Sequence, residues 1–77
     1  MPRRTVREID RFYCEDDDGN EYVVIEYQHY AISETLNRAP QEVPTTKECR
    51  LRDGKHVNVL GGDLFEIVET DVKIRKV

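Results

Sequence analysis

The sequence predicts an all-β, mostly antiparallel domain of five or six strands, built as a small β-sandwich or a partly open barrel. Apolar and polar residues alternate through residues 49–77, and turn signals interrupt this alternation at short intervals. Two further alternating segments flank an acidic loop within residues 6–30. A period of two with one apolar face is typical of a half-buried antiparallel sheet. Because neither half can bury its apolar face alone, we expect the two halves to pack against each other.

The length and composition are those of one small domain covering residues 1–77. The chain is 38% hydrophobic and 36% charged, and a domain of this size buries only about 60% of the surface that its unfolded chain exposes. The apolar residues are patterned rather than scattered, which argues against disorder. We therefore expect a modest core, and a homodimer that shares core residues is one way to enlarge it.

The first hairpin should begin after a flexible end at residues 1–5. Residues 6–14 and 21–30 have the alternation of two strands, joined by an acidic loop at residues 15–20. The run from Tyr22 to Ile25 is apolar on both sides, which is typical of a central strand rather than an edge strand.

The register of this hairpin depends on its turn. A two-residue turn at Asp18-Gly19 pairs Cys14 with Val23, because Gly accepts a left-handed backbone without a steric penalty. The apolar face then consists of Phe12, Cys14, Val23, Ile25 and Tyr27. Shifting the turn to Gly19-Asn20 keeps the same face, so we expect the face to be better determined than the register. A three-residue loop would change the face.

Residues 31–46 break the alternation and are expected to form a connecting loop between the two halves. Ser33 could cap a single helical turn at residues 34–38. Pro40 and Pro44 prevent a longer helix. A long structured connector in a small domain often carries function.

The C-terminal part predicts a meander with three turns, at Asp53-Gly54, Gly61-Gly62-Asp63 and Thr70-Asp71. The expected cross-strand pairs are Cys49–Val57, Val57–Ile67, Val59–Phe65, Ile67–Ile74 and Glu66–Arg75. One face then collects Cys49, Leu51, Val57, Val59, Phe65, Ile67, Val72 and Ile74. A shift by one residue would expose this whole set, so the face is well specified.

Two groups of residues have metal-binding side chains without metal-binding spacing. Asp16, Asp18 and Asn20 alternate as a calcium loop begins, but the sixth position is not Gly and the twelfth is Tyr27. Structural zinc sites need closely paired ligands, whereas the candidate ligands here occur singly: Cys14, His29, Cys49 and His56. We expect neither a metal nor a cofactor.

No set of catalytic residues can be assembled from the sequence. Cys14 is beside Glu15 and Cys49 is beside Glu48, and a neighbouring acid tends to raise a thiol pKa. The glycines at 61–62 join two strands and precede no helix, so they do not form a phosphate loop. We therefore expect a protein that is not an enzyme.

A tyrosine-bearing side of the second strand is the candidate interaction surface. With the two-residue turn, Tyr22, Glu26, Gln28 and Tyr30 point away from the core, together with Tyr13 of the first strand. Exposed tyrosines are enriched at protein interfaces, and the acidic surroundings favour a protein partner. The alternative is that these tyrosines pack beneath the 31–46 loop as a second small core.

Nucleic-acid binding through a small barrel is a second hypothesis. It would use the tyrosine side and the arginines near the N-terminus, Arg3, Arg4, Arg7 and Arg11. The net charge of the chain is −4, and phosphate contacts need clustered basic residues. We therefore do not expect nucleic acid as the partner.

Mimicry of nucleic acid is a third hypothesis, in which the acidic middle of the chain blocks a basic protein. It requires the acids of residues 15–26 to share one surface with Glu34, Glu42 and Glu48.

The sequence has no run of apolar residues that could cross a membrane and no signal-peptide pattern. Its two cysteines, Cys14 and Cys49, both fall on expected core faces, where a free thiol behaves as a small hydrophobic group. We expect a cytoplasmic protein with no membrane partner.

The last third of the chain resembles a pattern found in small uncharacterised bacterial or phage proteins of about this length. The pattern comprises Asp53-Gly54, Val57-Asn58, the run from Phe65 to Val68, and Ile74-Arg75. The resemblance implies a tight β-meander and a bacterial or phage origin. It implies no site residues.

Overall fold

The computed structural model describes residues 3–35 and 38–77, and its described elements are six antiparallel strands closed into a barrel. The strands are β1 (Arg3–Glu15), β2 (Glu21–Thr35), β3 (Arg38–Leu51), β4 (His56–Gly61), β5 (Leu64–Ile67) and β6 (Val72–Lys76). Each strand pairs with the next in sequence, and β6 returns to β1 through Cys14–Lys76 and Glu15–Arg75. The all-β antiparallel prediction is confirmed, and the barrel is closed rather than partly open.

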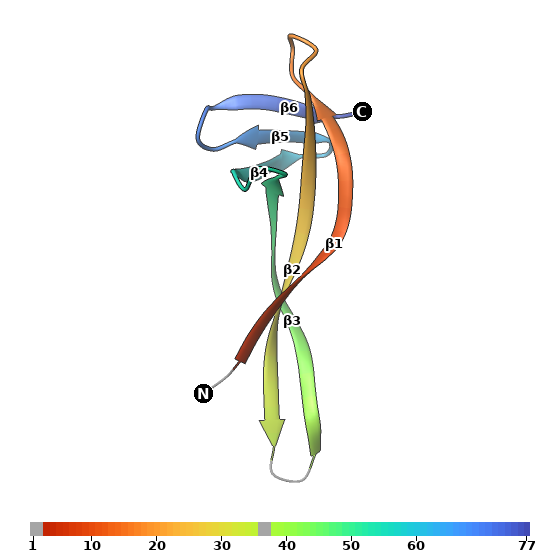
Figure 1. Cartoon of the computed structure of the whole chain (residues 1–77), viewed down its shortest axis with the longest axis vertical. Coiled ribbons are helices and arrows are strands. Elements are labelled where there is room, and N and C mark those ends of the chain that lie inside the picture. Colours follow the sequence, from red (N-terminus) through yellow and green to blue (C-terminus); the bar gives the residue numbers. More distant parts are fainter. Residues whose placement is uncertain (1–2, 36–37) are drawn as a thin grey trace.

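The first three strands are much longer than the last three, so the molecule is elongated, with extents of 56 × 21 × 21 Å. β6 pairs with β1 at only two residues, and β4 pairs with β3 only at Cys49 and Arg50. The remainder of β1, β2 and β3 projects from the barrel as a twisted three-stranded sheet (Figure 1). We call this projection the stalk, and it comprises residues 3–10, 26–35 and 38–48.

The prediction of a connecting loop at residues 31–46 is wrong. β2 continues through Thr35, and β3 begins at Arg38 and pairs back along β2. Pro40 and Pro44 are compatible with this strand because β3 is an edge strand there and its register shifts against β2 beside both prolines. The helical turn expected at 34–38 is also wrong, because residues 34–35 belong to β2 and residue 38 belongs to β3. Residues 36–37 lie outside the described residues.

The N-terminal end is also part of a strand, although we expected it to be flexible. Residues 3–5, expected to be flexible, belong to β1 and pair with residues 30–32 of β2. Residues 1–2 lie outside the described part of the chain.

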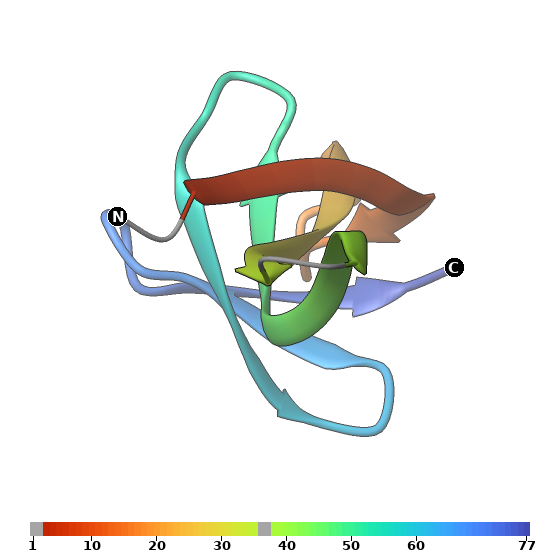
Figure 2. The ribbon, with the colours of Figure 1, turned by 90° about the horizontal axis from the view of Figure 1, so that it is seen from below.

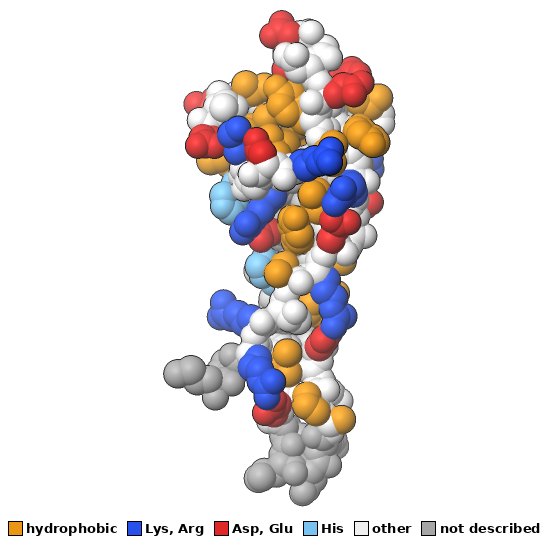
Figure 3. Space-filling view, in the orientation of Figure 1, with side chains coloured by type: hydrophobic (Ala, Val, Ile, Leu, Met, Phe, Trp, Pro, Cys, Tyr) orange, Lys and Arg blue, Asp and Glu red, His pale blue; other side chains and the backbone are white. Residues whose placement is uncertain are grey.

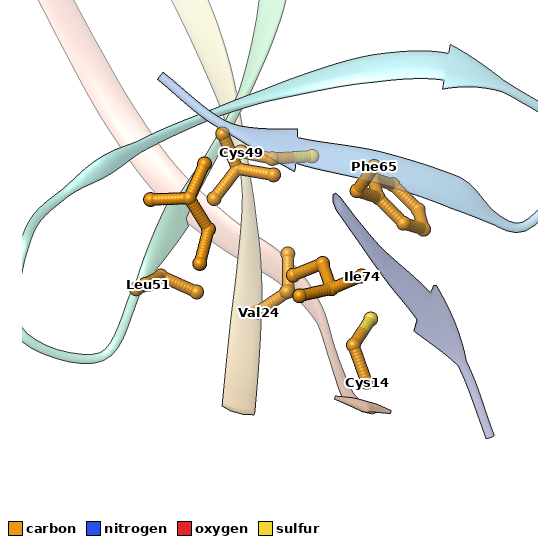
Figure 4. Packing of buried hydrophobic residues seen from close by; sticks show 8 residues of the cluster. Cys14, Val24, Cys49, Leu51, Phe65 and Ile74 are labelled. Carbon is orange, nitrogen blue, oxygen red and sulfur yellow. The ribbon is translucent and has the colours of Figure 1, made fainter. Parts of the chain in front are cut away.

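The barrel interior is filled by side chains, as expected for so few strands. The buried cluster consists of Cys14, Val24, Cys49, Leu51, Val57, Phe65, Ile67 and Ile74 (Figure 4). Phe12 closes one side of it, with its ring centroid 5.2 Å from that of Phe65. Seen along the long axis, the loops of the C-terminal half lie around the three long strands (Figure 2).

Three predicted pairs of the C-terminal half are confirmed: Cys49–Val57, Val57–Ile67 and Val59–Phe65. The pairing of Ile67 with Ile74 is wrong, because Ile67 pairs with Val72, and Glu66 pairs with Lys73 rather than Arg75. The connecting loop is longer than a two-residue turn and has Asp71 in the left-handed region at φ 57°. A shift by two residues preserves the face, so the predicted core side of β6 is still correct.

The predicted register of the first hairpin and the predicted core face of its second strand are both wrong, because three residues lie between the closing pair of the loop. Asp16 and Asn20 close the loop, the Gly19 N–H donates to the Asp16 carbonyl, and Gly19 has φ 82°. Cys14 therefore pairs with Tyr22, and the core side of β2 is reversed. The side chains of Val23, Ile25 and Tyr27 lie on the outside of the barrel.

Candidate functional site

The five residues predicted as an interaction surface do not share a face. Antiparallel partners point to the same side of a sheet, so Tyr22, Glu26, Gln28 and Tyr30 lie on the side of β2 that faces the barrel interior. Tyr13 lies on the opposite side and is 63% exposed. We call these two sides of the sheet the inner face and the outer face.

The inner-face residues have separate roles. Tyr22 packs against the barrel core, Glu26 lies 3.8 Å from Lys47, and Gln28 is only 7% exposed. Tyr30 is half-buried on the stalk. The alternative of a second core beneath a 31–46 loop is also wrong, because those residues form strands of the same sheet.

Gln28 is a buried polar residue at the base of the stalk. Its Nε2 group donates to the carbonyl of His29 at 3.0 Å and to the carbonyl of Thr46 at 3.1 Å. Thr46 lies where the register of β3 shifts against β2. The Gln28 side chain therefore satisfies a carbonyl beside a β-bulge, where the regular ladder is interrupted.

Ion pairs cover the inner face of the stalk. Arg7 on β1 reaches across β2 to Glu42 on β3, and its guanidinium lies 5.2 Å from the centre of the Tyr30 ring. Nearer the tip, Arg3 binds Glu34 at 2.8 Å. Basic and acidic side chains lie next to each other along the stalk in Figure 3.

The outer face of the stalk exposes apolar side chains instead. Val6 pairs with His29, and Ala31 lies between Arg4 and Val43. Val6 is 48% exposed and Val43 is 47% exposed. We call Val6, Ala31 and Val43 the apolar patch. It spans three adjacent strands, with Ala31 beside Val43 and Val6 one row closer to the barrel.

Two ion pairs flank the outer face closer to the barrel. Ile25 of β2 is 5% exposed although it points outward, and its cross-strand neighbours are Arg11 and Arg50. Arg11 binds Glu8 at 2.7 Å, and Arg50 binds Glu48 at 3.2 Å. Arginine stems cover apolar surface while their charged ends stay in water, which explains the burial of Ile25 outside the core.

Glu48 also accepts a hydrogen bond from His29 of β2, in addition to its ion pair with Arg50. Its Oε1 atom lies 2.9 Å from His29 Nε2. The hydrogen bond from His29 and the charge of Arg50 hold the pKa of Glu48 below its ordinary value. The Glu48 carboxylate is therefore ionised, and the charge of Arg50 in the same chain balances it at the edge of the apolar patch.

A cleft of about 410 Å³ opens where β3 and β4 part. Its lining residues are Glu26, Lys47, Glu48, Cys49, His56, Val57, Asn58 and Val59. Burial, followed by the charges of Glu26 and Glu48, raises the pKa of the Cys49 thiol. A thiol that stays protonated is a poor nucleophile, so this cleft contains no activated cysteine.

The second cysteine is also buried and free. Burial is the main cause that raises the pKa of Cys14 to about 11. Within residues 3–35 and 38–77, no three His, Cys, Asp or Glu side chains are grouped closely enough to hold a metal ion.

The unpaired edges of the stalk carry features that discourage strand addition. β1 has a bulge at Ile9, and the register of β3 shifts twice against β2. Pro40 and Pro44 remove two N–H donors from β3. Bulges and prolines are common protections of sheet edges, so contact with another protein is more favourable on a face than along an edge.

The charged residues required for nucleic-acid binding and for mimicry of nucleic acid do not form a single charged surface. Arg3, Arg7 and Arg11 are each bound to a carboxylate. The acidic loop and the strand ends that carry Glu34 and Glu42 lie at opposite ends of the long axis (Figure 1). The single acidic surface that mimicry of nucleic acid requires is not formed.

Searches of protein-family models, curated proteins and solved structures found no match to this chain. The resemblance of the last third of the chain stays a prediction. In the described part of the chain, no helix has the length and hydrophobicity needed to cross a membrane.

Proposed function

We propose that this chain is a non-enzymatic protein-interaction module that binds its partner through the outer face of the stalk. The observation that carries the proposal is the difference between the two faces of one sheet. Two ion pairs of the chain itself lie across the inner face of the stalk, whereas Val6 and Val43 of the apolar patch are about half exposed.

The physical basis is that a β-sheet normally packs against a second layer. Domains bury each apolar face against another element, but β4, β5 and β6 lie on the inner side of the long strands, so no described element covers the outer face of the stalk. Each Å² of apolar surface removed from water contributes roughly 25 cal/mol. A partner that supplies the missing layer over the stalk therefore gains binding energy.

A protein partner fits this surface better than nucleic acid. Three arginines of β1 are already neutralised by Glu34, Glu42 and Glu8, and affinity for a phosphate backbone depends on unneutralised basic groups. The raised pKa values of both buried thiols support a role without catalysis. Free buried cysteines are also common in a reducing compartment, and we place the module in the cytoplasm.

The test is affinity capture with a tagged chain that is mixed with host lysate and with an untagged copy of itself. Val6→Asp and Val43→Asp put charges on the apolar patch, and both should lose the captured protein. Val68→Asp is the matched control, because Val68 is 46% exposed but lies on the barrel. Equal thermal unfolding curves for the three variants would show that they fold alike. Capture unchanged by Val6→Asp and Val43→Asp would refute the proposal.

A further inference from the structure

We infer that the partner of the outer face is a second copy of this chain, packed face to face about a two-fold axis that runs across the strands at Val6–His29. This inference rests on the proposed function, because it names the occupant of the same surface. Closed two-fold symmetry is the commonest arrangement of homo-oligomers, and it requires a surface that is complementary to itself. The charge pattern of the outer face has this property.

The outer face is a ladder of rows that cross the three strands. Going from the tip toward the barrel, the rows are Arg4–Ala31–Val43, Val6–His29, Glu8–Tyr27–Glu48 and Arg11–Ile25–Arg50. The Val6–His29 row lies between a row that carries a positive charge and a row that carries negative charges. Reversing the ladder about this row therefore brings opposite charges together.

Two sheets that face each other about a two-fold axis have two simple arrangements. With the axis along the strands, each row meets its own copy, and β1 lies over β3 of the other chain. Glu8 then lies over the partner's Glu48, and Arg11 lies over the partner's Arg50. Like charges placed opposite each other are destabilising, so the ladder disfavours this arrangement.

With the axis across the strands, each strand lies over its own copy in the antiparallel direction. Arg4 then meets the partner's Glu8, whose carboxylate is shared with Arg11 of its own chain, and this contact occurs twice because of the symmetry. Val6 meets the partner's Val6 at the axis, and Ala31 meets the partner's Tyr27. Val43 lies over the partner's Glu48, whose carboxylate is already held by His29 and Arg50.

The shape of the molecule permits this overlap. The core lies on the inner face, so β4, β5 and β6 lie on that side of the long strands. The outer face of the stalk continues into the outer wall of the barrel, and two stalks can overlap without the barrels colliding. Because β1 begins at Arg3, all three strands overlap over roughly 24 Å, and β2 and β3 continue to roughly 34 Å, which together covers roughly 440 Å² per copy. This is the small end of specific interfaces, so we expect a dimer that dissociates on dilution.

Sedimentation velocity over a wide range of protein concentration is the first test. The wild type should shift from monomer to dimer as the concentration rises. Arg4→Glu and Glu8→Arg should each weaken the dimer by about tenfold, and the double variant should recover most of the loss, because it restores the pair with reversed charges. Val68→Asp on the barrel should leave the dimer unchanged.

Cysteine cross-linking then tests the direction of packing. Val6→Cys should form a disulfide with its own copy at the axis. Arg4→Cys alone should stay uncross-linked, whereas Arg4→Cys combined with Glu8→Cys should cross-link. The native thiols of Cys14 and Cys49 are buried and should not compete.

Three outcomes would overturn the inference. They are a wild type that stays monomeric at every concentration, a dimer that Val6→Asp does not weaken, and a charge-reversed double variant that recovers nothing. A monomeric wild type whose capture of another protein still depends on Val6 would remove only the self-association, and the proposed function would stand. If neither dimerisation nor capture of another protein depends on Val6, both the inference and the proposed function are wrong.

Discussion

The hydroxyl of Tyr22 donates a hydrogen bond of 3.0 Å to Asp16 Oδ2, which connects the start of β2 to the first residue of the hairpin loop. The same carboxylate accepts from the backbone N–H groups of Asp18 and Asn20, each at 2.9 Å, and from the Asn20 side chain at 3.0 Å. Asp16 therefore organises the loop whose length decides which side of β2 faces the core.

The charge of Asp16 should make the stability of the hairpin depend on pH. Hydrogen bonds, first among them that from the Asn20 side chain, hold the pKa of Asp16 below its ordinary value. A lowered pKa in the folded state contributes stability above the unfolded pKa, and this contribution is lost as the pH falls through the folded pKa. Asp16→Asn should therefore lower the melting temperature at pH 7, and the difference from wild type should shrink below about pH 4.

Circular dichroism melts of the wild type and Asp16→Asn between neutral and acidic pH measure this effect. Asp17→Asn, in the same loop, is the matched control and should show a much smaller difference. A difference between Asp16→Asn and wild type that stays constant across this range would contradict the assignment to the charge.

The buried thiol of Cys14 should be unreactive in the folded protein and should weaken the fold at high pH. Its pKa is raised to about 11, mainly by burial, so thiol reagents at pH 8 should label it only after denaturant is added. As the pH rises above the ordinary thiol value, the unfolded chain loses this proton first, and stability falls by up to about 1.4 kcal/mol per pH unit until the folded pKa is reached.

Urea unfolding at pH 8 and pH 10 tests the second part. Cys14→Ala should show a smaller loss of stability between the two pH values than the wild type does. Equal losses would mean that Cys14 does not contribute, and rapid labelling of the native protein at pH 8 would contradict its burial.

Gln28→Glu should destabilise the base of the stalk although it preserves the side-chain shape. The substitution removes the Nε2 donor that binds the carbonyls of His29 and Thr46, and it places carboxylate oxygens against them. We expect a loss of about 2–3 kcal/mol in the free energy of unfolding, measured by urea denaturation at pH 7. Gln41→Glu, on the exposed part of β3, should change it by less than about 0.5 kcal/mol. Similar effects of the two substitutions would contradict the role of Gln28.

Ile74→Ala should be strongly destabilising because Ile74 is fully buried in the barrel. The truncation removes apolar contacts and leaves a cavity, which costs about 2–5 kcal/mol. Ile9→Ala is the control, because Ile9 is 44% exposed at the β1 bulge. Chemical denaturation of both variants tests this, and a loss at Ile74 no larger than that at Ile9 would place the core elsewhere.

The C-terminal half shows how far alternation alone predicts this fold. Turn residues and alternation place Cys49 opposite Val57 and Val59 opposite Phe65, as observed. The last turn fails by two residues, because its length depends on a left-handed Asp71 that the pattern does not reveal. The face survives this error, since strand side chains repeat every two residues.

The candidate surface could not be predicted in the same way. A change of one residue in the first turn reversed β2, so Tyr22 moved against the core and Ile25 moved to the outside. Val6 and Val43 come together only because β2 pairs with both β1 and β3. The segment around Val43 contains Pro40 and Pro44 and therefore lacks the local signature of a strand.

Local chemistry along the chain thus determined the fold class, the core side of the last three strands and the burial of both cysteines. Closure of the barrel through Cys14–Lys76 and the free stalk depended on contacts between distant segments, and the side of β2 that faces inward depended on the exact length of the loop that Asp16 organises. The reason is that alternation records how one strand divides its side chains between two faces. Which face meets the core, and where a strand leaves its neighbour, are set by pairing energies summed over the whole barrel.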